Sequence, residues 1–295
     1  MLTKKQFDVL EYIAENEATS QRKISDGTHI SVGNVNKTVK ELTDLCFVHD
    51  GKITHAGREA LEPYRVKRAI FIAAGFGSRL VPITLNTPKP LVRVNGKRII
   101  DSMLDAVVAA GITDIYIVRG YLGEQFDQLL YKYPTIKFIE NPIYNEANNI
   151  SSALLAAPLI ENTYVFEADL LLYNPALIKK YQYSSNYLGV KVDKTDDWCF
   201  HTDNRLRITK LGIGGTDCYH MYGVSYWDAE QGAKLQKYIK AVFDSPGGKE
   251  RYWDQVPLEY YVNEFYVSVR PCTFDDLIEI DTFNELKQLD RSYDI

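Results

Sequence analysis

The first 66 residues place apolar and polar positions at the period of α-helices. The segment KKQFDVLEYIAEN puts Phe7, Leu10, Ile13 and Ala14 on one helical face. A shorter helix is predicted to follow, with Ser20 suited to be its N-cap. This part of the chain is therefore expected to be built from helices that each have one apolar face.

A third amphipathic helix and a short hairpin complete the N-terminal pattern. Ser31 is suited to cap this helix, which would place Val32, Val35, Val39, Leu42 and Leu45 on one face. Two short β-prone pieces then flank Asp50-Gly51, a dipeptide typical of tight hairpin turns.

Three helices followed by a small hairpin resemble a winged helix-turn-helix domain, which we predict for residues 1–66. The exposed face of its recognition helix would carry Asn34, Asn36, Lys37 and Lys40. The segment holds nine lysines and arginines and ten aspartates and glutamates, a net charge of −1, whereas DNA-binding modules usually have a basic face. A packing, dimerisation or ligand-sensing role is favoured over DNA binding, which stays open. Winged-helix modules often pair, so a homodimer is one expected assembly, although the sequence does not set the oligomeric state.

From Lys67 onward the pattern changes to short β-prone runs separated by helical stretches. The runs RAIFIAA, TDIYIVRG, IKFIEN and NTYVFEAD alternate with segments such as IIDSMLDAVVAAG and GEQFDQLLYKY. This alternation predicts an α/β domain with a mostly parallel or mixed sheet over residues 67–295. Such sheets bind ligands at the carboxyl ends of their strands, so the residues directly after these runs are candidates for chemistry.

Composition and charge exclude several classes of protein. The 295 residues are 45% hydrophobic and 25% charged, as in ordinary globular domains, and the net charge of −5 argues against general attraction to nucleic acid or anionic membranes. Acidic residues interrupt the N-terminal segment where a signal peptide needs an apolar core, and no apolar run is long enough to span a membrane. The four cysteines are scattered and predict neither a zinc site nor a disulfide framework. We expect a cytoplasmic protein.

A glycine-rich loop follows the first strand of the α/β domain. The strand ending at Ala74 leads directly into Gly75-Phe76-Gly77-Ser78-Arg79. Glycines let the backbone approach a ligand and turn successive N–H groups toward an anion. Arg79 and Lys89 could add cationic contacts, and prolines on both sides of Lys89 would stiffen its segment. The loop lacks the third glycine of a dinucleotide fingerprint and the G-K-[ST] of a P-loop.

The whole string AAGFGSRLVPITLNTPKPLVRVNGKRII resembles the nucleotide-binding signature of nucleotidyltransferases that join an NTP to a phosphorylated small molecule. The match covers AAG-x-G-S-R-L, P-x-T, PK-x-L-V and GK-x-I. The resemblance implies a Rossmann-like domain whose loop holds the triphosphate while Lys89 and Arg79 stabilise it. The implied nucleotide-binding residues are Ala73, Ala74, Gly75, Gly77, Ser78, Arg79, Lys89, Asn148 and Asn149.

Two aspartates are candidates for a divalent metal. Nucleotidyl transfer concentrates negative charge, so it needs a hard cation held by carboxylates. Asp169 follows the apolar run TYVFEA, and Asp281 follows another in DDLIEID; either could instead form a turn or cap a helix. The family resemblance, through an [E/D]-A-D motif and a later I-D-T motif, implies that both bind Mg²⁺.

Further segments resemble one branch of the family, the bacterial CTP:phosphocholine cytidylyltransferases. They are ENPIYNEANNISSAL, KTDDWCF, GVSYWDA and RYWDQVPLEYYV. A quaternary ammonium cannot donate a hydrogen bond, so proteins bind it with aromatic faces. Trp227 follows an apolar strand and suits a core position, so the expected choline box is Trp198, Tyr252 and Trp253, supported by Asp254.

The expected reaction is CTP plus phosphocholine giving CDP-choline and pyrophosphate by in-line attack on the α-phosphorus. Positioning and charge neutralisation would supply the catalysis. Phosphoethanolamine, 2-aminoethylphosphonate or a sugar-1-phosphate are alternative acceptors. A transcription regulator that uses the transferase-like domain to sense a nucleotide or CDP-choline is an alternative of another class.

Overall fold

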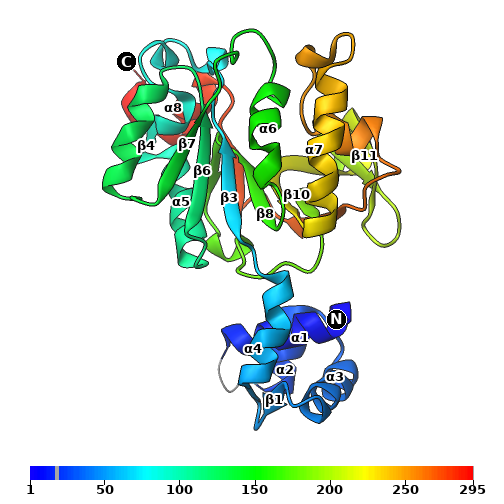
Figure 1. Ribbon diagram of the computed structural model, residues 1–295. Helices are drawn as coiled ribbons and strands as arrows, with labels where there is room; N and C mark the ends of the chain where they lie inside the picture. The colour runs from blue at the N-terminus through cyan, green and yellow to red at the C-terminus, as the bar shows by residue number, and fades with distance from the viewer. Residues whose placement is uncertain (17–19, 295) are drawn as a thin grey trace. The chain divides into compact units, whose positions relative to one another are not determined.

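The computed structural model describes residues 1–16 and 20–294, and it divides the chain into two compact units (Figure 1). The first unit is Met1–Arg65 together with Tyr181–Tyr183, and the second is Val66–Lys180 followed by the chain from Ser184 onward. The predicted boundary after residue 66 lies one residue from this division. The sequence pattern did not indicate that a short segment of the later chain, Tyr181–Tyr183, returns to the N-terminal unit; Ile295, the predicted end of the second domain, lies outside the described residues.

The first unit contains the predicted helices and hairpin in the predicted order. The helices are α1 (Lys4–Glu15), α2 (Gln21–Thr28) and α3 (Val32–Asp44), and strands β1 (Val48–His49) and β2 (Lys52–Ile53) form the hairpin. Asp50 and Gly51 both have positive φ, 48° and 72°, which matches the right-handed twist of a two-residue hairpin. Helix α4 (His55–Leu61) follows and was not predicted; the Thr54 side chain caps it by accepting a hydrogen bond from the Gly57 N–H.

The core of the first unit includes side chains of the returning segment. Leu10, Val35 and Leu42 are fully buried at its centre. The Tyr183 ring stacks on Tyr64, with centroids 5.5 Å apart, and its hydroxyl donates to the Leu2 carbonyl. Tyr181–Tyr183 therefore contributes packing area to the N-terminal unit.

The second unit is organised around a seven-stranded mixed sheet in the order β12-β10-β11-β8-β3-β6-β7. Its strands are β3 (Arg68–Ile72), β6 (Asp114–Arg119), β7 (Ile136–Glu140), β8 (Thr163–Glu167), β10 (Asn186–Thr202), β11 (Ile208–Trp227) and β12 (Ser268–Cys272). Strands β8, β3, β6 and β7 run parallel, and β11 is antiparallel to both β8 and β10. The four parallel strands are the four β-prone runs of the sequence, so the predicted α/β fold is confirmed.

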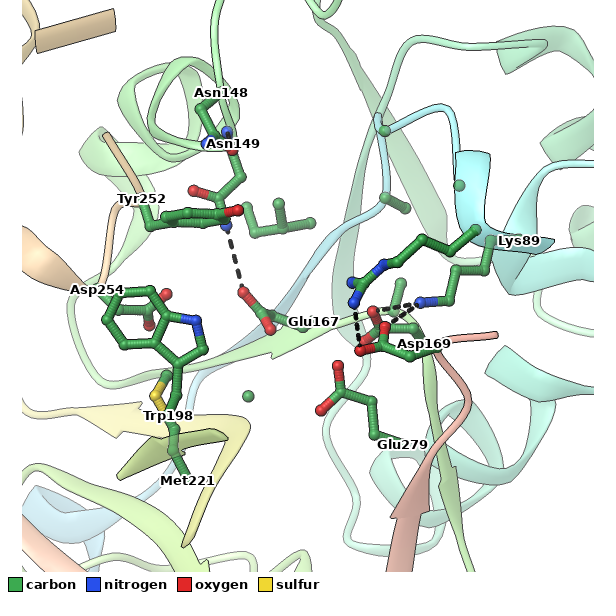
Figure 2. A pocket seen from close by; sticks show the side chains of 18 of the residues that line it. Lys89, Asn148, Asn149, Glu167, Asp169, Trp198, Met221, Tyr252, Asp254 and Glu279 are labelled. Carbon is green, nitrogen blue, oxygen red and sulfur yellow. Dashed lines mark hydrogen bonds and ion pairs between the residues drawn. The ribbon is translucent and has the colours of Figure 1, made fainter. Parts of the chain in front are cut away.

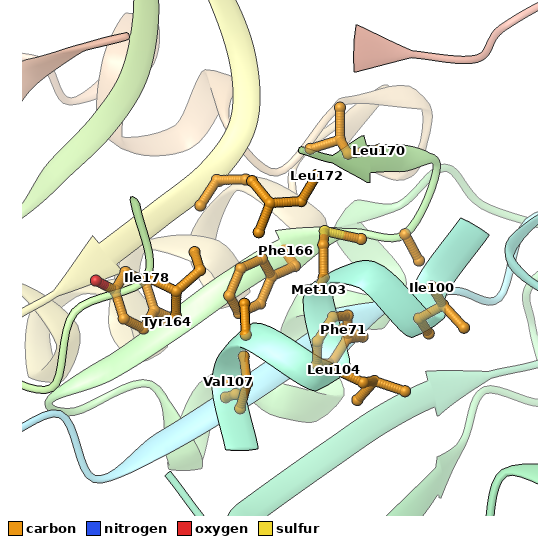
Figure 3. Close-up of a cluster of buried hydrophobic side chains, with 14 of the residues drawn as sticks. Phe71, Ile100, Met103, Leu104, Val107, Tyr164, Phe166, Leu170, Leu172 and Ile178 are labelled. Atoms are coloured by element: carbon orange, nitrogen blue, oxygen red, sulfur yellow. The ribbon is translucent and has the colours of Figure 1, made fainter. Parts of the chain in front are cut away.

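Helices cover both faces of this sheet. Helix α5 (Ile99–Ala109) buries Met103 and Leu104 against Phe71 and Phe166 on one face (Figure 3). Helices α6 (Ile150–Ala156) and α7 (Ala229–Phe243) pack on the other face (Figure 1). Burial on both faces explains why the central strands β3 and β8 are nearly continuous apolar runs. The segment GEQFDQLLYKY, predicted as an ordinary helix, is wound as a 3₁₀ helix over Gly123–Tyr131 after Leu122 in the left-handed conformation.

The second unit also has two short ribbons, one of which joins segments far apart in the chain. Strands β9 (Leu170–Leu172) and β13 (Leu277–Glu279) pair antiparallel, and Leu170 lies opposite Glu279. This pairing brings the residues around Asp169 next to those around Asp281. The other ribbon, β4 (Arg93–Val94) with β5 (Lys97–Arg98), leads into α5, and helix α8 (Phe283–Leu289) follows β13. Within the described residues, none of the helices has the length and apolar character needed to cross a membrane.

Candidate active site

A pocket of about 510 Å³ lies at the carboxyl ends of β3 and β8, whose last residues are direct neighbours in the sheet. Carboxylates and Lys89 lie at one end, Trp198, Tyr252 and Asp254 lie at the other, and Glu167 lies between them (Figure 2). The predicted residues that line the pocket are Ala73, Gly75, Gly77, Ser78, Arg79, Lys89, Asn148, Asn149, Asp169, Trp198, Tyr252, Asp254 and Asp281. Ala74 and Trp253 are not among the residues that line it.

The loop after β3 depends on Gly77. Its φ of 67° is left-handed, and a Cβ there would lie 3.0 Å from the Lys89 Cβ and 3.2 Å from the Thr84 Cγ2. The Gly77 carbonyl accepts hydrogen bonds from the Leu80 N–H and the Thr84 hydroxyl, which close the loop into a short 3₁₀ turn over Ser78–Leu80. A glycine at this position therefore keeps the loop against Lys89.

Lys89 is a buried cation held between two carboxylates. Its Nζ lies 2.9 Å from Asp169 Oδ2 and 3.0 Å from Asp281 Oδ1. Burial lowers the pKa of Lys89, but these two carboxylates outweigh it, and the pKa is raised overall. Arg79 Nη1 approaches the other oxygen of Asp281 at 2.7 Å. Both cations expected to bind phosphate are thus paired with the two aspartates expected to bind metal.

A third carboxylate, Glu279, belongs to this group. Ligand atoms of Asp169, Glu279 and Asp281 all lie within 4.8 Å of one another. Glu279 was not predicted, although the spacing in IEID puts it two residues from Asp281 and hence on the same side of an extended chain. Asp281 does not cap α8, because Thr282 and Glu285 form the capping box, and its carboxylate stays with Lys89 and Arg79.

The donor set of this cluster fits a hard divalent cation. Oδ1 of Asp169 is buried without a hydrogen-bond partner among the described residues, which leaves an acceptor that a cation would satisfy. Burial, together with the charges of Asp169 and Asp281, raises the pKa of Glu279 well above its usual range. Three carboxyl groups this close together offer oxygen ligands of the kind that suit Mg²⁺.

The opposite end of the pocket has aromatic walls. Trp198 on β10 and Tyr252 meet edge to face, with centroids 5.7 Å apart and planes at 68°. Met221 on β11 lines the pocket beside them (Figure 2). Trp253 was predicted to belong to this box, but it is 1% exposed and packs against Trp227 and Tyr187 in the core. Adjacent side chains of an irregular segment point in different directions, so only Tyr252 faces the pocket.

Asp254 is a buried carboxylate beside the aromatic pair. It is 4% exposed, lines the pocket and accepts a 2.5 Å hydrogen bond from the Tyr187 hydroxyl. Burial raises its pKa to about 7, against a lowering by the Tyr187 hydrogen bond. Glu167, at the end of β8, also has a pKa raised well above its usual range by burial and by the nearby charges of Asp254 and Asp169.

The asparagine pair before α6 holds two parts of the pocket together. Asn149 Nδ2 donates to Glu167 Oε1 at 3.2 Å, and its Oδ1 accepts from the Trp253 N–H at 2.9 Å. The backbone N–H of Asn148 donates to the Lys249 carbonyl. Both residues, predicted to bind nucleotide, line the pocket, and their hydrogen bonds to protein groups position the Tyr252–Asp254 segment.

Several other residues that line the pocket were not predicted from the sequence. They are Ile72, Pro90, Glu167, Ala168, Asp197, Leu211, Met221, Gly223, Gln255 and Glu279. Glu167 lies two residues before Asp169, and Asp197 lies directly before Trp198. Their closeness in sequence to predicted residues was the signal that could have identified them. Met221 and Leu211 come from β11, and nothing local in the sequence indicates that β11 reaches the pocket.

Comparison with protein families assigns both units. The family model described as nucleotidyl transferase matches residues 68–186, and the model described as winged helix-turn-helix DNA-binding matches residues 2–45. The second match agrees with the predicted helices of the N-terminal unit.

Individual relatives match about three quarters of this chain over nearly their whole length. A 2-aminoethylphosphonate cytidylyltransferase of Lancefieldella rimae is 36% identical over 228 residues, which are 76% of this chain and 92% of that protein. A choline-phosphate cytidylyltransferase of Streptococcus pneumoniae is 31% identical over 224 residues, 76% of this chain and 97% of that protein. The solved structure of the CTP:phosphocholine cytidylyltransferase from Streptococcus pneumoniae superposes with a TM-score of 0.71 at 32% identity, covering 77% of this chain and 99% of that one. The chain therefore belongs to the nucleotidyl transferase family, as a cytidylyltransferase of phosphorylated substrates that carries an N-terminal winged helix-turn-helix unit.

Proposed function

We propose that the protein transfers CMP from CTP to phosphocholine, giving CDP-choline and pyrophosphate. The observation that carries this proposal is the edge-to-face pair of Trp198 and Tyr252 beside the buried carboxylate of Asp254. Two aromatic faces and a carboxylate suit a trimethylammonium group, which is attracted to rings and to negative charge but donates no hydrogen bond. Each ring face contributes roughly 0.5–2 kcal/mol to binding such a cation.

The pocket orders the two substrates along its length. The triphosphate of CTP would lie at the glycine loop, Arg79 and Lys89, and the choline group at Trp198, so the acceptor phosphate would lie between them near the α-phosphorus. A phosphate oxygen of phosphocholine attacks the α-phosphorus in line, and the bond from that phosphorus to the oxygen bridging to the β-phosphate breaks. Pyrophosphate leaves with the bonding electron pair. The nucleophile is already an anion, so no side chain has to remove a proton.

The chain's own residues bind and orient the charged groups. Asp169, Glu279 and Asp281 would hold Mg²⁺, which supplies charge neutralisation on the phosphates when bound. Lys89 and Arg79 would leave their carboxylate partners for phosphate oxygens, and the loop at Gly75 and Gly77, which lines the same end of the pocket, would offer backbone N–H groups to the same charge. Catalysis then comes mainly from positioning and electrostatic stabilisation.

A second acceptor, 2-aminoethylphosphonate, is supported by a specific observation. Asp197 and Glu167 line the pocket together with Asp254, and a primary ammonium donates hydrogen bonds that such carboxylates accept. The relative from Lancefieldella rimae carries this activity in its name. The two acceptors differ in their expected dependence on Trp198, because a primary ammonium relies on carboxylates more than on ring faces.

Pyrophosphate release from CTP with Mg²⁺ tests the proposal. Phosphocholine, phosphoethanolamine, 2-aminoethylphosphonate and glucose-1-phosphate are offered in parallel to the wild type, Asp169→Asn and Trp198→Ala. The proposal expects a preference for phosphocholine, loss of activity in Asp169→Asn and a KM for phosphocholine raised about tenfold in Trp198→Ala. Asp193→Asn and Tyr131→Ala, at exposed positions, are the matched controls. If 2-aminoethylphosphonate is turned over and the rate is unchanged in Trp198→Ala, it replaces phosphocholine as the proposed acceptor. Turnover with none of the four acceptors would contradict the proposed enzyme function.

For the N-terminal unit we propose a regulatory role through nucleic acid or a small ligand. Asn34, Asn36, Lys37 and Lys40 on α3 are all exposed, as expected of a recognition helix, and the matching family model is described as DNA-binding. Because the net charge of the unit is close to zero, ligand sensing remains an alternative to DNA binding. Fluorescence anisotropy with duplex DNA at two salt concentrations decides between them: affinity that falls with salt and with Lys37→Glu supports DNA binding, and no binding leaves the sensing role.

A further inference from the structure

The hydroxyl of Tyr187 makes a short hydrogen bond to Asp254, the buried carboxylate beside Trp198 and Tyr252 in the pocket. Tyr187 lies on β10, is fully buried and does not line the pocket. Its hydroxyl donates to Asp254 Oδ1 at 2.5 Å. Burial raises the pKa of Tyr187 well above its usual range, with the charge of Asp254 adding to the effect, so the phenol stays a donor at neutral pH.

The ring of Tyr187 is fixed on several sides. It meets Trp227 edge to face at 5.9 Å and Phe200 at 5.5 Å, and it stacks on Trp253 at 6.2 Å. Trp253 is the residue before Asp254, and its backbone N–H is held by Asn149. The aspartate is therefore held at its carboxylate by Tyr187 and at its backbone through Trp253.

We infer that Tyr187 is a positioning residue that orients the Asp254 carboxylate toward the positively charged group of the acceptor. A buried carboxylate without this donor would turn freely between its rotamers and would bind a cation with a less defined geometry. The inference rests on the proposed function only in that the acceptor carries a positive charge, which phosphocholine and 2-aminoethylphosphonate share. Trp253, which does not form a wall of the box, acts in this arrangement through its packing on Tyr187.

The same hydrogen bond sets how much of Asp254 is ionised. The titratable groups around it are Glu167 on β8, Tyr187 and Asp197 on β10, and Tyr252 on its own segment. Burial raises the pKa of Asp254 to about 7 and the Tyr187 hydroxyl lowers it. Removing that hydroxyl raises the pKa further, so less of the carboxylate is charged at neutral pH. Binding of a cationic acceptor needs the charged form, and its KM should fall as pH rises through this pKa.

Tyr187→Phe tests the inference, because it keeps the ring and removes one oxygen atom. Tyr226→Phe is the matched control, a buried tyrosine whose hydroxyl contacts Asn162 and not the pocket. Steady-state kinetics with phosphocholine and CTP are measured between pH 6 and 8.5, with circular dichroism as a check of folding. We expect the KM for phosphocholine to rise about tenfold in Tyr187→Phe and its pH inflection to move upward, while kcat and the KM for CTP stay within about twofold. Taking the ratio of variant to wild type at each pH removes the ionisation of the acceptor itself.

The outcomes separate this inference from the proposed function. If Asp254→Asn abolishes the pH dependence and raises the same KM, the inference gains support, because this variant removes the charge that Tyr187 orients. If the wild type uses phosphocholine but Tyr187→Phe keeps its KM and inflection, the inference is wrong and the proposed function stands. A wild type that uses only 2-aminoethylphosphonate replaces the acceptor, and the same ratios are then measured with it. A wild type that uses only glucose-1-phosphate overturns both.

Discussion

Replacing Lys89 by methionine removes the one buried cation from the carboxylate cluster while keeping most of the side-chain volume. The ammonium group contacts Asp169 at 2.9 Å and Asp281 at 3.0 Å, and its side chain is 11% exposed. Glu279 lies within 4.8 Å of both aspartates through its ligand atom. After the change, Arg79, which is exposed, is the one ion-pair partner of the cluster left among the residues that the structure describes.

The size of the effect follows from burial. Removing one partner of a buried ion pair costs about 3–5 kcal/mol, and the side chains of Asp169 and Asp281, 22% and 21% exposed, favour the lower end. A loss of about 3 kcal/mol corresponds to a fall of about 6–12 °C in Tm for a unit of this size. Burial and the neighbouring charges raise the pKa of Glu279 well above its usual range, and its protonation relieves repulsion in the cluster, so the loss should be smaller at pH 5 than at pH 8.

Thermal unfolding at both pH values, with and without MgCl2, measures this effect. We expect Mg²⁺ to raise the Tm of Lys89→Met more than that of the wild type, because in the wild type Lys89 already neutralises the cluster. Lys97→Met, at an exposed position in the β4–β5 ribbon, is the control and should change neither value. A Tm equal to that of the wild type at pH 8, or an equal response to Mg²⁺, would refute the account of Lys89 as the cation that stabilises these carboxylates.

Three further predictions test other parts of the second and first units. Gly77→Ala should raise the KM for CTP at least about tenfold, because the new Cβ crowds Lys89. The control is Gly96→Ala, whose φ is 83° and whose new Cβ would meet open space. It introduces only the backbone strain of about 1–2 kcal/mol and should leave that KM unchanged. Burial raises the pKa of Asp254 to about 7, so its contribution to stability is complete below about pH 4 and is lost as pH rises through 7. Between pH 5 and pH 8, the free energy of unfolding measured with urea should therefore fall less in Asp254→Asn than in the wild type, by up to about 1.4 kcal/mol per pH unit. Tyr183→Ala should destabilise the N-terminal unit by about 1–3 kcal/mol, seen as faster hydrogen exchange in α1, whereas Tyr131→Ala, 95% exposed, should not.

Local patterns in the sequence predicted the fold because each element satisfies its own rules. The parallel strands are apolar because both faces are covered, and Asp50-Gly51 forms its turn through positive φ at both residues. The glycine loop and Asp169 could be proposed because they follow β3 and β8 closely, and the carboxyl edge of a parallel sheet holds ligands. Asp281 follows β13, which lies outside that sheet, and was a candidate through the family resemblance.

What the sequence did not reveal depends on tertiary packing. Trp253 and Tyr252 are adjacent and similar in kind, and only the course of the backbone decides that one is buried and the other faces the pocket. Glu279 joins Asp169 through the β9–β13 ribbon, a pairing of short strands far apart in the chain. Tyr187 looks like any strand tyrosine until the fold brings it to Asp254.

The returning segment Tyr181–Tyr183 has a consequence for the order in which the chain is made. The N-terminal unit leaves the ribosome first, but its core lacks the rings of Tyr181 and Tyr183 until synthesis has passed β3, β6, β7 and β8. Its helices can form early, yet its full packing has to wait for the first half of the transferase sheet. A cut at residue 66 would therefore separate the N-terminal unit from part of its own core, and a transferase fragment made this way would carry tyrosines that have lost their partners.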